Sequence, residues 1–293
     1  MGPLVIGRTG QLARALDALL PNATCLGREA LDLAGDGLAI CKTLDAHGAA
    51  SESGVILAAA YTDVDGAEED RDTAHAVNAV APGIIARWCA ERGAPLVHVS
   101  TDYVFDGRAV SPYGPDHPTQ PLNVYGRTKR DGETAIQDSG ANAAILRTSW
   151  VHDGQGRNFL TSMLRLAAMR DTLRIVSDQT GRPTYAPDLA RAAVAALETI
   201  ATDPSTGGTY HVTNTGDPVS WAGFAAAIFD AAEKRMRIEP ITTAEFGAPA
   251  PRPAYSVLDT EAFERGFGYA LPDWRDGMRR ALQEADLGAE GTS

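Results

Sequence analysis

The sequence predicts an α/β protein with a doubly wound parallel sheet, Rossmann-like, and a smaller C-terminal substrate lobe. Short, almost continuously apolar runs alternate with longer amphipathic ones, which is the pattern of repeated βαβ units. The apolar runs lack a polar alternation, as expected of strands that helices cover on both faces. A turn with two glycines, "GRTGQLA", directly follows the first run, where such a sheet commonly binds a ligand.

The first half of the chain supplies most of the predicted sheet. Strands are expected at residues 3–7, 23–27, 54–60, 95–101 and 143–151, and a later one at 208–214. Helical patterns lie between them, at 10–20, at 75–93 and around Tyr125. Right-handed crossovers would place these helices on both faces and leave the ligand at the carboxyl ends of the strands.

The alternation loosens after about residue 150. Helices are expected at 158–170 and at 220–235, the second with Ser220 as its N-cap. Residues 173–197 are read as a strand, a loop and a helix, and the proline-rich stretch 238–260 as a draped loop rather than a strand pair.

These patterns predict two parts. Residues 1–150 would form an NAD(P)-binding domain, to which a return segment at about 184–213 contributes, and residues 151–183 and 214–293 would form the substrate-binding lobe.

Composition and charge exclude several classes of protein. Hydrophobic residues make up 44% of the 293 residues and charged ones 22%, as in ordinary globular proteins. A net charge of −12 offers no basic surface for nucleic acid. No apolar run approaches the roughly 20 residues of a membrane helix. The first residues enter a strand pattern at once, so we expect no signal peptide. Three scattered cysteines, Cys25, Cys41 and Cys89, favour the cytoplasm.

The first two strand ends suggest a dinucleotide site. Gly7 and Gly10 would form the tight turn that lets backbone N–H groups approach a pyrophosphate, although an ordinary glycine turn has the same pattern. Arg28 follows the second strand, where an NAD site usually carries an acid and an NADP site an arginine. We therefore expect NADPH, and Glu29 keeps NADH open as the alternative.

A catalytic cluster is predicted from the fourth strand and the helix that follows it. Tyr125 and Lys129 in "NVYGRTK" are four residues apart, so on a helix they share one face. A surface tyrosine stacked on a lysine stem is the simpler interpretation of this pair alone. Thr101 ends the preceding strand, however, so the fold can bring the three together. A nearby ammonium would lower the pKa of the tyrosine and make it a better proton donor for the reduction of a ketone.

Seven segments carry a family resemblance. In chain order over roughly residues 3–260 they are "AAAYTDVDGAE", "VHVSTDYVFDG", "PLNVYGRTK", "LRTSWV", "NFLTSMLRLA", "DQTGRPT" and "RPAYSVLD". Together they resemble the extended short-chain dehydrogenase/reductases, and most closely the dTDP-4-dehydrorhamnose reductase family. The resemblance implies that NADPH reduces the C4 ketone of dTDP-4-dehydro-6-deoxy-L-mannose to give dTDP-L-rhamnose. It implies a nucleotide-sugar partner and leaves a homodimer open.

The resemblance also assigns roles to single residues. It implies Tyr125 as proton donor, Lys129 as its electrostatic partner, and Thr101 with Asp102 as the tuning pair beside the substrate. Trp150 would contact the sugar nucleotide, with core packing as the alternative. The implied cofactor contacts are Gly10, Gln11 and Leu12 at the pyrophosphate, Asp32 and Leu33 at the adenine, and Ala60, Tyr61, Thr62 and Val99 along the groove.

Some positions depart from the family pattern. Leu57 stands where an asparagine is usual, and Tyr255 stands where "RPxNS" would have one, so substrate preference is open. Some relatives form metal-bridged dimers through acidic side chains on the first helix, but this helix has Ala15 and a single Asp17, so we predict no such metal.

Three other functions remain as alternatives. Another nucleotide-sugar reductase or epimerase of the same superfamily would share the fold. A 4,6-dehydratase would carry a glutamate directly after "TD", and Tyr103 stands there instead. A non-catalytic NADP-binding regulatory subunit would not need Thr101, Tyr125 and Lys129 together, so their presence favours an enzyme.

Overall fold

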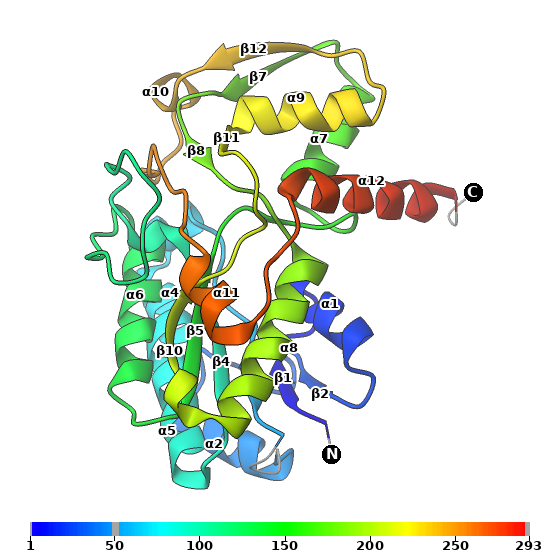
Figure 1. Ribbon diagram of the computed structural model, residues 1–293. Helices are drawn as coiled ribbons and strands as arrows, with labels where there is room; N and C mark the ends of the chain where they lie inside the picture. Colours follow the sequence, from blue (N-terminus) through cyan, green and yellow to red (C-terminus); the bar gives the residue numbers. More distant parts are fainter. Residues whose placement is uncertain (1, 49–52, 291–293) are drawn as a thin grey trace.

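A six-stranded parallel sheet forms the centre of the molecule, in the order β10-β5-β4-β3-β1-β2 (Figure 1). The computed structural model describes residues 2–48 and 53–290. The sheet strands are β1 (Leu4–Ile6), β2 (Thr24–Leu26), β3 (Val55–Leu57), β4 (Leu96–Thr101), β5 (Ala143–Thr148) and β10 (Gly208–His211). The six predicted strands are thus confirmed, each somewhat shorter than its predicted range.

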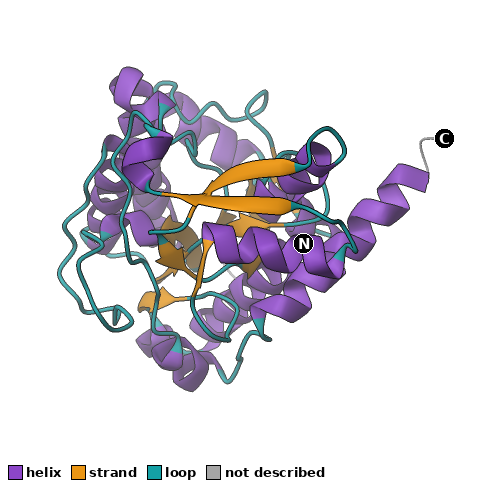
Figure 2. Cartoon of the chain, turned by 90° about the horizontal axis from the view of Figure 1, so that it is seen from above, coloured by secondary structure: helices purple, strands orange, loops and turns teal. Residues whose placement is uncertain are grey.

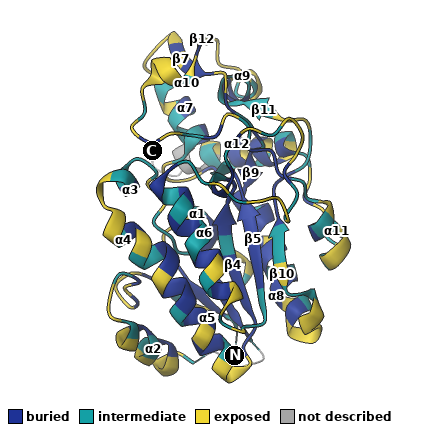
Figure 3. Cartoon of the chain, turned by 90° about the vertical axis from the view of Figure 1, so that its left-hand side faces the viewer, coloured by how far each residue is buried: buried dark blue, intermediate teal, exposed yellow. Residues whose placement is uncertain are grey.

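Helices cover both faces of this sheet. Because side chains alternate along a strand, Leu4 and Ile6 enter the core on one face and Val5 the core on the other. The first face packs against α2 (Gly37–Ala46), α5 (Ala81–Arg92) and α6 (Val124–Gln137). The second packs against α1 (Gln11–Leu19), α8 (Ala186–Thr202) and α11 (Glu261–Phe267). The predicted doubly wound class is confirmed, and Figure 3 shows the buried strands between helices with exposed outer surfaces.

The segment between β3 and β4 carries shorter helices before α5. They are α3 (Gly66–Glu69), α4 (Arg71–His75) and the π-helical turn η1 (Ala76–Val80). Single 3₁₀ turns follow β4 and α8, namely η2 (Asp102–Val104) and η3 (Pro204–Thr206).

A second lobe lies above the carboxyl ends of the sheet strands (Figure 1). Its own apolar core contains Leu160, Phe224 and Trp274. Its helices are α7 (Phe159–Ala167), α9 (Trp221–Ala231), α10 (Thr243–Phe246) and α12 (Trp274–Glu290). Its strands are β6 (Val151–His152), β7 (Thr172–Val176), β8 (Thr180–Gly181), β9 (Thr184–Tyr185), β11 (Val219–Ser220) and β12 (Arg237–Ile241). The predicted N-cap is confirmed, since the Ser220 side chain accepts from the N–H of Gly223.

The expectation of a draped loop at 238–260 is wrong for its first residues. β12 pairs in parallel with β7 in a two-stranded sheet, and the two lie side by side in Figure 2. Pro240 is tolerated because β12 has a partner on one side only, so its missing N–H need not serve a second neighbour. A capping box of Thr242 and Glu245 then begins α10.

The order of the strands reverses beside β1. The chain runs from β1 through α1 to its neighbour β2, and then crosses to β3 on the other side of β1. A doubly wound sheet opens a crevice outside its carboxyl ends at such a switch point. Within the described ranges, no helix combines the length and apolar character needed to cross a bilayer.

Candidate active site

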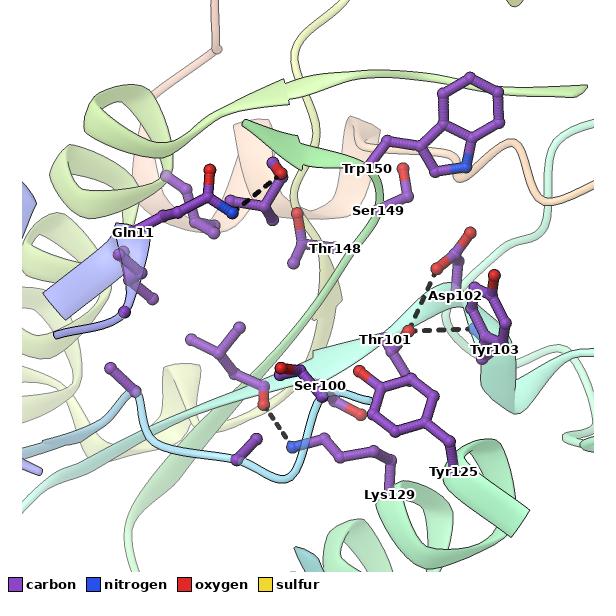
Figure 4. A pocket seen from close by; sticks show the side chains of 18 of the residues that line it. Gln11, Ser100, Thr101, Asp102, Tyr103, Tyr125, Lys129, Thr148, Ser149 and Trp150 are labelled. Carbon is purple, nitrogen blue, oxygen red and sulfur yellow. Dashed lines mark hydrogen bonds between the residues drawn. The ribbon is translucent and has the colours of Figure 1, made fainter. Parts of the chain in front are cut away.

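A cavity of about 530 Å³ opens at this switch point, between the sheet and the second lobe (Figure 4). It gathers residues from the ends of four strands and from the helices that follow them. The predicted site residues that line it are Gly10, Gln11, Leu12, Ala60, Thr62, Val99, Thr101, Asp102, Tyr125, Lys129 and Trp150.

Five predicted residues lie outside the cavity lining. Gly7 has φ of 136°, and a Cβ there would come within 3.3 Å of the N–H nitrogen of Ala59, so it shapes the turn. The backbone of Tyr61 is bonded to the amide of Asn78. The other three follow β2: the exposed pair Arg28 and Asp32, 3.7 Å apart, and the buried Leu33. Their contacts with a cofactor stay predictions.

Several lining residues were missed from the sequence. They are Thr9, Arg14, Ala58, Val64, Ser100, Tyr103, Thr148, Ser149, Val151, Arg157 and Leu189. Thr148 ends β5 and Ser149 directly follows it, so the rule that ligands bind at strand ends could have found them. Arg157 lies in the loop between β6 and α7 and Leu189 on α8, and nothing local in the sequence marks either.

The glycine turn presents a helix N-terminus to the cavity. Gly10 caps α1 without a side-chain hydrogen bond, so the first N–H groups of α1 have no side-chain partner. A Cβ on Gly10 would meet nothing within 4 Å, so the space above the turn is open. Gln11 donates through Nε2 to the carbonyl of Val151 over 3.2 Å, whereas its buried Oε1 has no hydrogen-bond partner. These features fit an anionic dinucleotide.

Helix α6 brings Tyr125 and Lys129 to the floor of the cavity, as Figure 4 shows. Its first turn is fixed by two caps, because Asn123 accepts from the N–H of Gly126 and Glu68 from that of Val124. A Cβ on Gly126 would lie 2.2 Å from the carbonyl oxygen of Tyr103. Only glycine therefore allows the helix to approach the end of β4 this closely.

Lys129 is buried, and its hydrogen bonds are made to residues other than Tyr125. Its Nζ donates to the carbonyl of Val99 over 2.7 Å and lies 3.1 Å from Nε2 of His98. Burial lowers the pKa of Lys129 to about 8, although the Glu133 carboxylate works in the opposite direction. Burial also lowers the pKa of His98 well below its ordinary value, and the Lys129 charge acts the same way.

The pKa of Tyr125 differs from the sequence expectation. It is raised to about 12, first by burial and also by the charge of Asp102, while the Thr101 hydroxyl works to lower it. Burial is the largest of these effects, so the lowered pKa that the sequence led us to expect is not found in the protein without a cofactor.

Asp102 is a buried carboxyl beside the tyrosine. Its Oδ1 accepts from the Thr101 hydroxyl over 3.1 Å, and its buried Oδ2 has no hydrogen bond of good geometry. Burial raises the pKa of Asp102 to about 7, although the Ser256 and Thr101 hydroxyls favour its ionised form. The group can therefore hold or release a proton at neutral pH.

The side chain of Trp150 is tightly packed, and its backbone is strained. Its ring stacks on that of Trp221, with centroids 3.5 Å apart and 8° between the planes. A Cβ on Gly181 would lie 2.7 Å from the Trp150 ring. Its φ of 48° is an outlier for a bulky residue, and it breaks the strand expected at 143–151 into β5 and β6. Such strain concentrates at functional sites.

The two departures from the family pattern lie outside the cavity lining. Leu57 is buried at the end of β3 and packs into the sheet core. Tyr255 is partly exposed, and its ring centroid lies 6.3 Å from that of Tyr113. Their effect on substrate preference stays a prediction. In the part of the chain that the structure describes, no three His, Cys, Asp or Glu side chains group as metal ligands would.

Comparisons with known proteins agree with this geometry. A family model described as "RmlD substrate binding domain" matches residues 1–287. The dTDP-4-dehydrorhamnose reductase of Burkholderia thailandensis is 42% identical over 93% of this chain and 95% of its own. A probable dTDP-4,6-dihydroxy-2-methyloxan-3-one 4-ketoreductase of Streptomyces antibioticus is 40% identical over 96% and 94%. The structure of a Bacillus anthracis dTDP-4-dehydrorhamnose reductase in complex with NADP superimposes with a TM-score of 0.88, at 34% identity over 97% of this chain and 100% of that one.

Proposed function

The chain belongs to the RmlD substrate binding domain family, and on that premise we propose that it reduces a nucleotide-linked ketosugar with NADPH. The substrate is dTDP-4-dehydro-6-deoxy-L-mannose and the product dTDP-L-rhamnose. The observation that carries the proposal is the meeting of Thr101, Tyr125 and Lys129 in one cavity with the open N-terminus of α1. The relatives named as reductases of this sugar support the choice of substrate.

Side chains of the protein would donate the proton and replace it. NADPH, bound over Gly10 and Gln11, supplies the hydride that reduces C4 of the sugar. Tyr125 gives its hydroxyl proton to the new alkoxide as general acid. The Thr101 hydroxyl stabilises the same oxygen, and Asp102, bonded to Thr101, carries a replacement proton at neutral pH because its pKa is about 7.

Lys129 would assist once a cofactor occupies the cavity. An ammonium has three N–H donors, and two of them are taken by Val99 and His98. The third is left for a hydroxyl of the nicotinamide ribose. Its positive charge then favours the tyrosinate that remains after the proton is given away.

We also propose that the two parts of the chain bind different ligands. Residues 1–150, with the return segment at about 184–213, would hold most of the cofactor, and residues 151–183 and 214–293 would hold the sugar. The three cysteines are unpaired, which supports a reducing compartment such as the cytoplasm. Light scattering would test the homodimer that the sequence leaves open.

The reduction can be tested directly. The purified protein is mixed with NADPH and enzymatically prepared dTDP-4-dehydro-6-deoxy-L-mannose, and the loss of NADPH absorbance is followed. We expect one dTDP-L-rhamnose per NADPH consumed, identified by chromatography against a standard. dTDP-4,6-dihydroxy-2-methyloxan-3-one is the second sugar to try. An isomerised sugar without net NADPH consumption would identify an epimerase instead, and cofactor binding without turnover of either sugar would favour a regulatory subunit.

A further inference from the structure

The loop at residues 153–158 is fastened to the glycine turn. Arg14 of α1 joins the two, because it donates to the Asp153 carboxylate over 2.6 Å and to the carbonyl of Thr9 over 2.5 Å. The same guanidinium lies 3.4 Å from the carbonyl of Gln155, and a Cβ on Gly156 would lie 3.4 Å from it. The loop is therefore held against the Arg14 side chain, beside the glycine turn.

The loop also carries hydrogen bonds of its own. The Asn158 side chain donates to the carbonyls of Asp153 and Gln155, and the N–H of Gln155 donates to the Asp153 carboxylate. Thr161 closes the other end by donating to the carbonyl of Gly156 over 2.9 Å. The backbone that carries Arg157 is consequently held in place before any ligand arrives, so binding there costs little ordering of the main chain.

Among the described residues that line the cavity, Arg157 is the basic residue whose side chain has no ion pair or hydrogen bond. Arginine and lysine side chains line the cavity at three described positions. Arg14 is paired with Asp153, and Lys129 is bonded to Val99 and His98 on the floor. Arg157 is exposed, and the structure records no ion pair or hydrogen bond for its guanidinium. In a chain with a net charge of −12, an unpaired arginine at the mouth of a site for an anionic ligand is an available phosphate partner.

We infer that Arg157 closes over the pyrophosphate of the dinucleotide and binds it from the side opposite the N-terminus of α1. The inference rests on the proposed function, since it deepens the cofactor site described above. It places a cofactor contact in residues 151–183, the part otherwise proposed to hold the sugar. The pyrophosphate is favoured over the 2′-phosphate because the loop is bonded to Arg14, which is itself bonded to Thr9 of the glycine turn, whereas the predicted 2′-phosphate partner Arg28 follows β2.

Direct binding tests the inference without any turnover. Affinities for NADPH, NADH and dTDP-L-rhamnose are measured by calorimetry for the parent protein, Arg157→Gln and Arg165→Gln. Arg165 is a matched control, because it is an exposed arginine on α7 outside the cavity lining. We expect Arg157→Gln to weaken NADPH and NADH equally, by about tenfold, with a reduced dependence on salt, as for one lost charge-assisted hydrogen bond. Its affinity for dTDP-L-rhamnose and that of the control for all ligands should not change.

The other outcomes each overturn the inference. Weaker binding of NADPH alone would assign Arg157 to the 2′-phosphate, and weaker binding of dTDP-L-rhamnose alone would assign it to the sugar nucleotide. Unchanged affinities would leave it a surface arginine, and equal losses in the Arg165→Gln control would show only an effect of net charge. Failure of the parent protein to bind either dinucleotide would instead defeat the proposed function.

Discussion

The ammonium of Lys129 lies 3.1 Å from Nε2 of His98, inside the protein and below the cavity floor. The low pKa of His98 keeps the imidazole neutral, so it can accept from the ammonium. Nδ1 of His98 is buried without a hydrogen-bond partner, so the contact with Lys129 is the one recorded for this ring. We therefore predict that His98 positions the lysine.

Replacing His98 should change the pH dependence of the reaction. His98→Leu removes the acceptor, so the charged form of Lys129 becomes harder to keep and its pKa should fall below about 8. The alkaline limb of kcat/KM should then move to lower pH, while His98→Gln, which keeps an acceptor oxygen, should leave it nearly in place. Rates are measured from about pH 6 to about pH 10. Identical limbs in both variants would show that His98 only fills space.

Tyr125→Phe tests the proton donor. The ring and its packing remain, including the edge contact with Tyr103 at 5.6 Å, but the proton is lost. We expect kcat to fall roughly 10²- to 10⁴-fold with nearly unchanged NADPH affinity, because general acid catalysis contributes about that much. Thr101→Val should cost less, about 10- to 100-fold, as one hydrogen bond to a developing charge. A folded Tyr125→Phe protein with most of its kcat would show that another group supplies the proton.

Asp102 should make the unliganded protein less stable as pH rises. Its folded pKa of about 7 lies above the ordinary value of 3.8, so between these values the folded protein holds a proton that the unfolded chain has lost. The stabilisation from this proton declines as pH rises from about 4 to about 7 and is gone above 7. Asp102→Asn does not titrate, so its unfolding free energy minus that of the parent should rise by about 1.4 kcal/mol per pH unit up to about pH 7.

Urea unfolding without cofactor, at steps from about pH 5 to about pH 8, measures this difference. Comparing variant with parent cancels the buried histidines, whose lowered pKa values act in the opposite sense. A difference that does not vary with pH would mean that Asp102 is ionised throughout.

Arg28 should select the cofactor. Its side chain is 81% exposed, and its ion pair with Asp32 is a long surface contact of 3.7 Å. The guanidinium can therefore turn toward a 2′-phosphate. Arg28→Ala should lower the ratio of kcat/KM for NADPH to that for NADH by about tenfold, chiefly through KM for NADPH. Glu29→Gln is the complementary variant, since that carboxylate, now paired with Arg8 at 3.2 Å, is the group an NADH site would use. A parent enzyme that prefers NADH would contradict the prediction.

Variants of Trp150 and Trp221 should distinguish a role in substrate binding from a role in packing. Both rings share the 3.5 Å stack, but only Trp150 lines the cavity. Trp150→Ala and Trp221→Ala should each lower the unfolding free energy, by up to roughly 3–5 kcal/mol. Only Trp150→Ala should also raise KM for the sugar nucleotide while NADPH binding is kept. Equal KM values in both variants would leave Trp150 with a packing role alone.

Local patterns in the sequence predicted the sheet and the core of the candidate site. Near-continuous apolar runs predicted five of the six strands, because a strand covered on both faces must be apolar throughout. The spacing of Tyr125 and Lys129 predicted their shared helix face, since the helical period alone decides it. Thr101 was predicted to lie beside them because the carboxyl ends of parallel strands meet at one edge of the sheet.

Contacts between distant segments were decided only by the tertiary structure. The pairing of β12 with β7, the stack of Trp150 on Trp221 and the fastening of the 153–158 loop to Arg14 each join segments more than 60 residues apart. The pKa of Tyr125 was expected to be lowered, yet burial in the folded chain raises it, and the ammonium of Lys129 bonds to His98 and Val99. Periodicity reports which face of an element is buried, but the partner on that face, and with it the pKa of a buried group, depends on how the elements pack.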